Sequence, residues 1–338
     1  MSDNKTYRAL VAEELEGEFR QTIKRLTVKD LPDHDVLVRV HYSSLNYKDA
    51  LSASGNRAVT KTYPFTPGID ASGIVEQSRD SKFAPGDKVI VTSYDLGMNT
   101  PGGFGEYIRV PCDWVVPLPD GLSLKESMMI GTSGLTAALG VEKIIHQNIE
   151  PKSGSLLVTG ATGGVGSFAV ALLSHLGFEV TAVTGKPDQK EWLMKIGADR
   201  IISREEVTDV PVKPLLTSRW IAAIDTVGGT MLDAVIRQTA HNGTVACCGN
   251  VLGHQLETSI YPFILRGVSL LGIDSGIATM EDRLRIWNKL ATEWKFSALL
   301  QLSNVCILEE LPDTISQVLD EIHIGNTLIV HKKPSTRE

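Results

Sequence analysis

A glycine-rich segment near the middle of the chain has the residue types and the spacing of a phosphate-binding turn. It reads Gly160-Ala161-Thr162-Gly163-Gly164-Val165-Gly166, and it follows an apolar strand-like run and opens a helix-like run. Gly163 lets the backbone approach a pyrophosphate, Gly166 permits tight packing of helix on strand, and the free amides at the helix start attract an anion. The segment therefore predicts a dinucleotide site, although Ala161 stands where the first glycine of the G-x-G-x-x-G pattern would fall.

The type of coenzyme depends on the end of the next strand, where an NAD site places a carboxylate roughly 20 residues further on. Here the sequence reads Val183-Thr184-Gly185-Lys186, without an acid. A hydroxyl, a glycine amide and an ammonium suit a 2′-phosphate, and Arg204, just past the third strand, can add bidentate contacts. We therefore expect NADPH. The alternative, that Lys186 and Arg204 are ordinary solvated surface charges, stays open at this point.

The elements that would position these residues alternate between strand and helix. Six strand-like runs suit a doubly wound parallel sheet, and a helix is expected from Pro187, with Gly197 as its cap. The six runs cover residues 155–159, 179–183, 200–202, 220–225, 243–247 and 268–273.

The flanking parts of the chain show a different pattern of predicted secondary structure. The first 120 or so residues are short strands broken by turns, which indicates a small irregular barrel. Ser123 and Glu126 have the spacing of a capping box, which predicts a helix start. After Ser275 we expect a helix over 280–294, a strand over 304–308, a helix over 311–322 and a strand over 327–330. These last elements are expected to rejoin the first domain.

Composition bounds the class of protein. The length of 338 residues predicts two domains, each with its own core. The net charge is −7, which disfavours a protein whose main task is to neutralise nucleic-acid phosphate or to coat an anionic membrane. The four cysteines form no C-x-x-C pattern, so neither a disulfide framework nor a cysteine-rich zinc site is expected.

Two segments bear on location. The N-terminal run Met1 to Leu10 lacks the basic start and apolar core of a secretory signal, so the expected location is cytoplasmic. Residues 153–178 carry no formal charge and are long enough to span a bilayer, but six glycines and His175 interrupt them. We interpret this stretch as strand, turn and helix, and we expect no membrane segment.

Several motifs together resemble the zinc-independent quinone oxidoreductase branch of the medium-chain dehydrogenase/reductase superfamily, in particular its acrylyl-CoA reductase-like members. The likeness covers essentially the whole chain. It rests on residues 44–50 (SLNYKDA), 67–73 (PGIDASG), 158–166 (VTGATGGVG), 261–267 (YPFILRG) and 272–275 (GIDS).

The resemblance implies an α/β fold with a GroES-like β-rich catalytic domain and a Rossmann domain. The catalytic domain would comprise residues 1–123 and 275–338, and the NADPH-binding domain residues 124–274. The resemblance also implies a homodimer joined through the last Rossmann strand, Val268 to Ile273.

The resemblance also implies site residues. Zinc-dependent members of the superfamily carry a cysteine and a Gly-His-Glu motif where this chain has Asn46-Tyr47 and Gly68-Ile69-Asp70, so no metal is expected. Tyr47 and Asp70 are the implied catalytic residues. The implied cofactor contacts are Tyr47, Thr162, Gly163, Gly164, Val165, Thr184, Gly185, Lys186, Arg204, Asn250, Ile264 and Ser275.

We hypothesise that hydride passes from C4 of NADPH to the β-carbon of an α,β-unsaturated thioester such as acrylyl-CoA, and that the resulting enolate is protonated at its α-carbon. Tyr47 is the candidate to bind the oxyanion or to relay the proton, and Asp70 the candidate to orient nearby groups. A structural role for each stays open: Asp70 tying down backbone amides, and Tyr47 packing against nicotinamide.

Two other functions stay open. An NADPH:quinone oxidoreductase would need no cationic patch for coenzyme A phosphates, for which Arg57, Lys61 and Arg266 are candidates in the thioester reductase. A non-catalytic NADPH-binding protein is the third reading, and the intact glycine turn and Lys186 argue against it.

Overall fold

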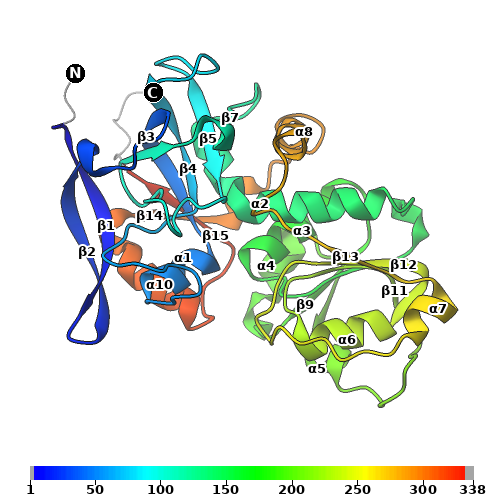
Figure 1. Ribbon diagram of the computed structural model, residues 1–338. Helices are drawn as coiled ribbons and strands as arrows, with labels where there is room; N and C mark the ends of the chain where they lie inside the picture. The colour runs from blue at the N-terminus through cyan, green and yellow to red at the C-terminus, as the bar shows by residue number, and fades with distance from the viewer. Residues whose placement is uncertain (1–3, 332–338) are drawn as a thin grey trace. The chain divides into compact units, whose positions relative to one another are not determined.

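The computed structural model describes residues 4–331, which form two compact units (Figure 1). Of the described residues, the first unit contains 4–132, 276–291 and 303–331. The second contains residues 133–275 and 292–302. The chain thus changes unit after residues 132 and 275, and residues 292–302 belong to the second unit.

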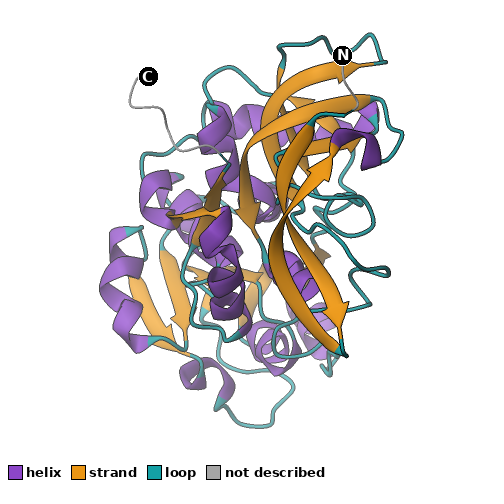
Figure 2. Ribbon diagram, turned by 90° about the vertical axis from the view of Figure 1, so that its left-hand side faces the viewer, coloured by secondary structure: helices purple, strands orange, loops and turns teal. Residues whose placement is uncertain are grey.

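The first unit is built on two β-sheets. A long antiparallel hairpin is formed by β1 (Thr6–Leu15) and β2 (Glu18–Thr27), and Figure 2 shows it facing the viewer. The second sheet has seven strands in the order β14-β15-β3-β4-β5-β7, with β6 paired to β3. These strands are β3 (Val36–Leu45), β4 (Asp70–Ser78), β5 (Lys88–Thr92), β6 (Tyr107–Val110), β7 (Val115–Pro117), β14 (Ser303–Ile307) and β15 (Asn326–Val330).

The C-terminal strand enters this sheet beside an N-terminal one. β15 pairs antiparallel with β3, with Val330 opposite Tyr42, so the end of the chain does rejoin the first domain. The helices of this unit are α1 (Tyr47–Ala53), α8 (Met280–Ala291) and α10 (Leu311–Leu319). The expected helix over 280–294 therefore ends at Ala291, and the one over 311–322 ends at Leu319.

The second unit is a six-stranded parallel sheet in the order β10-β9-β8-β11-β12-β13, as the alternating pattern predicted. Its central strands are buried without alternation because helices cover both faces. In Figure 1, α3 (Gly164–His175) and α4 (Lys190–Lys195) lie on one face, and α5 (Glu205–Thr208) and α6 (Gly229–Arg237) lie on the other. The strands are β8 (Leu156–Val158), β9 (Val180–Thr184), β10 (Arg200–Ser203), β11 (Trp220–Asp225), β12 (Thr239–Cys247) and β13 (Ser269–Gly272).

The helices α3 to α7 connect these strands in turn, and α9 follows the last of them. The helix expected from Pro187 begins as a 3₁₀ turn over Pro187–Gln189 and continues as α4. The helices are α3 (Gly164–His175), α4 (Lys190–Lys195), α5 (Glu205–Thr208), α6 (Gly229–Arg237), α7 (Tyr261–Arg266) and α9 (Leu299–Leu302). The uncharged stretch 153–178 is therefore the predicted strand, turn and helix.

The helix α2 (Leu124–Ile145) begins where the capping box predicted. The amide of Glu126 donates to the Ser123 hydroxyl (3.1 Å), and the Glu126 carboxylate accepts from the Ser123 amide (2.8 Å). A break in helical geometry at Gly131 (φ 53°, ψ −162°) divides α2. Of the residues described, only α2 is long and apolar enough to cross a membrane by length and composition. In its most apolar stretch, 83% of residues are buried within the protein, which is typical of a core helix.

Candidate functional site

The glycine turn joins β8 to α3, as its sequence context predicted. Gly160 adopts a positive φ of 58°, and a Cβ on Gly166 would lie 2.2 Å from the Gly160 carbonyl oxygen, so neither position tolerates a side chain. Gly163 caps α3 and is exposed, and a Cβ there would meet only the Gly160 oxygen at 3.4 Å. The turn therefore presents bare backbone at the start of a helix.

The first helical hydrogen bond of α3 runs from the Ser167 amide to the Gly163 carbonyl (2.9 Å). The amides of Gly164 and Val165 precede it and have no partner within the helix. Three features coincide here: exposed backbone, unpaired amides and the positive end of a helix dipole. Together they suit an anion such as a pyrophosphate.

The residues predicted to contact a 2′-phosphate lie together where β9 and β10 end. A Cβ on Gly185 would lie 2.8 Å from Nε and 3.0 Å from Cζ of Arg204, so the guanidinium rests against the bare backbone of Gly185. The Lys186 amide donates to the Thr184 hydroxyl (3.0 Å), which lies 3.5 Å from the Thr162 hydroxyl of the glycine turn. The structure thus joins this cluster to the pyrophosphate-type turn within one unit.

The remaining cofactor-contact predictions fall at different places in the second unit. Asn250 follows β12 and is exposed, and Ser275 follows β13, is 8% exposed and shares a 2.6 Å hydrogen bond with Thr136. Both follow the carboxyl ends of their strands, where ligands bind in such sheets. Ile264 is 62% exposed on α7, whose last residue, Arg266, bonds to backbone at the amino end of β12. The structure does not bring Ile264 to the carboxyl edge of the sheet.

Tyr47 lies in the first unit as the first residue of α1, and 46% of its surface is exposed. The residue before it, Asn46, caps the helix. The backbone amide of Asn46 donates to Oδ2 of Asp49 (2.8 Å), and the backbone amide of Ile69 donates to Oδ1 of Asp49 (2.8 Å). Asp49 therefore ties the start of α1 to the segment that leads into β4, and it fixes the backbone from which Tyr47 projects.

Asp70 is fully buried and accepts hydrogen bonds from three neighbours. Its Oδ2 accepts from Nδ2 of Asn46 (2.8 Å), from the Thr132 amide (2.8 Å) and from the Ser44 hydroxyl, and its Oδ1 accepts from the Thr132 hydroxyl (2.6 Å). Burial raises the pKa of Asp70, while the hydrogen bonds from Ser44 and Thr132 oppose the shift. With both oxygens occupied and no solvent access, Asp70 is arranged to hold Asn46 and Thr132 in place rather than to contact a substrate.

Asp49 and Thr132 were not singled out from the sequence. Asp49 could have been found, because Asn46 and Asp49 have the N-x-x-D spacing of a capping pair. Burial raises the pKa of Asp49 to about 7, and the nearby charge of Asp70 adds to the shift. No sequence pattern around Thr132 indicates its contact with Asp70, because that contact depends on the break in helical geometry at the preceding residue, Gly131. A Cβ on Gly131 would lie 2.8 Å from Oδ2 of Asp70.

The three candidate contacts for coenzyme A phosphates separate into two groups. Arg57 and Lys61 line one surface hollow of the first unit. Arg266 belongs to the second unit, where Nη1 donates to the carbonyls of Arg237 and Thr239 (3.1 Å each) and Nη2 to the carbonyl of Leu216. Its guanidinium is committed to holding backbone, so Arg266 is not a phosphate contact.

The residues where zinc-dependent members of the superfamily carry ligands do not suit zinc here. Asn46 donates its amide to a carboxylate, and Ile69 has an apolar side chain. Within residues 4–331, His, Cys, Asp and Glu side chains form no group of three that could hold a metal ion.

Comparison with known protein families gives two matches. Residues 32–120 match the alcohol dehydrogenase GroES-like domain, and residues 164–288 match the family described as zinc-binding dehydrogenase. Together they cover parts of both units.

Individual relatives match over nearly the full chain. "Putative quinone oxidoreductase YhfP" of Bacillus subtilis (strain 168) is 42% identical over 96% of this chain and 98% of its own. The crystal structure of that protein with NAD bound superposes with a TM-score of 0.94, covering 97% of this chain and all of the other. Acrylyl-CoA reductase AcuI of Ruegeria pomeroyi is 40% identical over 93% of this chain and 96% of its own.

A third relative bears on the coenzyme. The crystal structure of the yhdH oxidoreductase from Salmonella enterica in complex with NADP has a TM-score of 0.93 and 40% identity, covering 96% of this chain and 100% of the other. Among these similar proteins, therefore, structures exist with either NAD or NADP bound.

Proposed function

This chain belongs to the medium-chain dehydrogenase/reductase superfamily, in the branch of quinone oxidoreductases and acrylyl-CoA reductases, and from that premise we propose that it is an NADPH-dependent reductase of an α,β-unsaturated thioester such as acrylyl-CoA. The choice of NADPH as coenzyme rests on the cluster of Thr184, Gly185, Lys186 and Arg204. This cluster offers a hydroxyl, bare backbone and two cations, and it contains no carboxylate. The 40% identity to an acrylyl-CoA reductase supports the choice of acceptor.

The residues present fit the coenzyme. Gly163, Gly164 and Val165 would hold the pyrophosphate at the start of α3, and Lys186 and Arg204 would hold the 2′-phosphate. Bound there, reduced nicotinamide supplies the hydride that adds to the β-carbon of the thioester. A carboxylate for ribose hydroxyls, which an NAD site uses, is missing from the end of β9.

The chain's own share in the reaction is placement and proton supply. Tyr47, exposed at the start of α1, presents its hydroxyl to the thioester oxygen, which becomes negatively charged as hydride adds, and supplies or relays the proton for the α-carbon. Asp70 and Asp49 act on this step only through the backbone and Asn46, because both are fully buried.

The test is steady-state oxidation of NADPH with acrylyl-CoA beside a simple quinone. We expect one thioester saturated per NADPH consumed, and a higher kcat/KM for acrylyl-CoA than for the quinone. The second candidate, a quinone oxidoreductase, is favoured by the 42% identity to YhfP, and the reverse ratio would establish it. If neither acceptor supports NADPH consumption, the remaining function is that of a non-catalytic NADPH-binding protein.

A homodimer through β13 forms part of the proposal. β13 is an edge strand with half-buried Leu270 and Leu271, and the residues before it expose several large apolar side chains. These side chains are Val251, Leu252, Leu256, Ile260, Tyr261, Ile264 and Leu265. Sedimentation at twice the chain mass of 36.7 kDa would support the dimer, and a monomer at micromolar concentration would contradict it. A cytoplasmic location stays a prediction from the sequence.

A further inference from the structure

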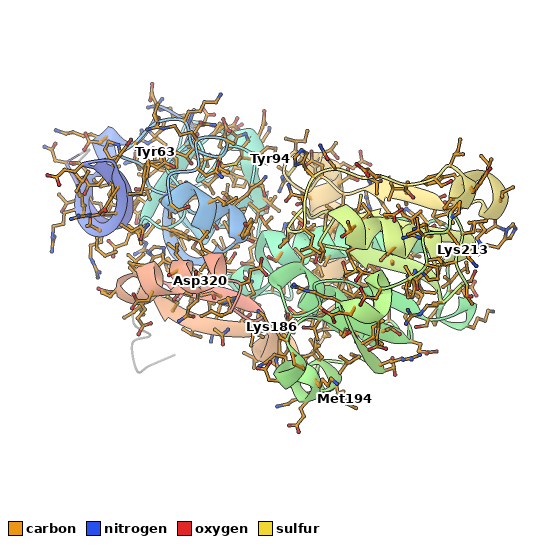
Figure 3. The ribbon with its side chains drawn as sticks, turned by 90° about the horizontal axis from the view of Figure 1, so that it is seen from below. Tyr63, Tyr94, Lys186, Met194, Lys213 and Asp320 are labelled. Carbon is orange, nitrogen blue, oxygen red and sulfur yellow. The ribbon has the colours of Figure 1, made fainter. Side chains whose placement is uncertain are left out.

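We propose that a surface hollow of the first unit binds the phosphate groups of a coenzyme A thioester, an inference that rests on the proposed function. The hollow has a volume of about 410 Å³ and lies between the end of β1 and the loop that follows α1. Its lining contains two cations, one aromatic ring and two carboxylates. The lining residues are Glu13, Glu14, Arg57, Lys61, Thr62, Tyr63 and Pro64, of which Figure 3 labels Tyr63.

The charges of this hollow leave a cation available. Arg57 pairs with Glu14 (2.6 Å), and Glu13 pairs with Lys24 of β2 (2.7 Å). The side chain of Lys61 makes no ion pair or hydrogen bond within the described chain. With Lys24 included, three cations stand against two carboxylates. Arg57 uses Nη1 to donate to the Lys61 carbonyl (3.0 Å) and Nη2 to pair with Glu14, so loosening the Glu14 pair frees Nη2 for a phosphate while Nη1 stays bound. Arg57 and Glu14 are largely solvated, so that exchange costs little.

The aromatic ring of the hollow is held in a fixed position. The Tyr63 hydroxyl donates to the Ser52 carbonyl (2.6 Å), and the ring packs edge-on against Phe19 at a centroid distance of 4.7 Å. The Arg57 guanidinium lies 5.6 Å from the ring centroid. A planar base can stack on a ring or a guanidinium plane, so the hollow also offers a surface for the adenine of coenzyme A.

The distance from the proposed reaction centre suits a coenzyme A thioester. Tyr47 opens α1, and Ser52, which holds Tyr63, lies near its other end. A helix of this length spans about 10 Å, which is shorter than an extended pantetheine arm. A thioester at Tyr47 can therefore place its phosphates at Arg57 and Lys61 without leaving the first unit.

The closing experiment compares acrylyl-CoA with acrylyl-pantetheine, which carries the same thioester and no phosphate. We expect K61A and R57A each to raise the KM for acrylyl-CoA about tenfold, the usual effect of losing one charge-assisted hydrogen bond. The KM values for acrylyl-pantetheine and for NADPH should not change, which separates coenzyme A phosphates from those of the dinucleotide. E14Q should lower the KM for acrylyl-CoA, because it frees Arg57.

The matched control is K213A, which removes an exposed lysine of the other unit (Figure 3) and should leave both thioesters unaffected. Equal losses for the two thioesters in K61A, or no loss for either, would overturn the site while leaving the reductase activity in place.

If the wild type reduces neither thioester, the proposed function fails, and calorimetry with coenzyme A alone decides the site. Binding weakened in K61A but not in K213A supports it, and equal or absent binding overturns it.

Discussion

The guanidinium of Arg204 lies against the backbone of Gly185, so close that a Cβ on Gly185 would come within 2.8 Å of its Nε. The two residues follow different strands, β10 and β9, and the parallel pairing of Ser203 with Thr184 brings them together. This contact brings Gly185 and Arg204, which the sequence predicts separately, into one cluster whose groups suit an anion. It also makes coenzyme selectivity a property that single substitutions can test.

We expect R204A to raise the KM for NADPH by about tenfold to a hundredfold and to leave the KM for NADH unchanged, because only the phosphorylated coenzyme loses a charge-assisted contact. R200A, at an exposed arginine of the same strand, is the control. Steady-state kinetics with both coenzymes measure the effect. An equal change in KM for NADPH and NADH would show that Arg204 does not bind the 2′-phosphate.

The substitution Y47F tests the proposed proton supply. Removing the hydroxyl should lower kcat for acrylyl-CoA about a hundredfold, as is usual for loss of a general acid, without changing the KM for NADPH. Y42F in β3 is the control, since Tyr42 belongs to the same unit and has no proposed role. Unchanged turnover in Y47F would dismiss the acid role and leave Tyr47 as a packing residue.

The break in α2 provides a stability prediction. In G131A the new Cβ would lie 2.5 Å from the Ser44 hydroxyl and 2.8 Å from the Asp70 carboxylate, at a φ of 53°. We expect a loss of about 2 kcal/mol or more in the free energy of unfolding. Gly140 of the same helix is the control, because its Cβ would meet neighbours only at 3.8 Å, and G140A should be neutral or stabilising. Urea denaturation measures both variants.

His331 predicts a loss of stability in acid. Burial lowers its pKa from 6.5 to about 4, and its Nε2 lies 2.7 Å from the Gly103 carbonyl. Because the folded pKa lies below the unfolded one, the stabilisation is complete above pH 6.5 and is lost as the pH falls toward 4, up to about 3 kcal/mol. H331Q keeps a donor without titrating, so its unfolding free energy should vary less over this range. Parallel curves for wild type and H331Q would contradict the assignment.

Asp49 predicts the opposite slope. Its folded pKa of about 7 lies above the ordinary value of 3.8, so its protonated form stabilises the fold and stability is lost as the pH rises from about 4 to 7. The slope from this group approaches about 1.4 kcal/mol per pH unit. In D49N this slope should disappear, and the unfolding free energy measured at pH 5 and pH 7 should show the difference. A slope that persists in D49N would assign it to another group.

The sequence by itself determined the Rossmann sheet, the glycine turn and the residue types for a coenzyme phosphate. Each of these features depends on a pattern of a few neighbouring residues, such as a strand period, a cap or a G-x-x-G spacing. A short window of sequence therefore contains the whole signal. The same is true of the Ser123 and Glu126 cap.

Only the tertiary structure decided which polar groups meet. Asp70 gathers donors from Ser44, Asn46 and Thr132, and Arg57 and Lys61 share a hollow with β1 residues far away in the chain. Arg266 looked like a free cation and instead holds backbone carbonyls from three distant residues. Such contacts depend on how strands and helices pack, and no local pattern records that, because the energy that selects them comes from burial across the whole unit.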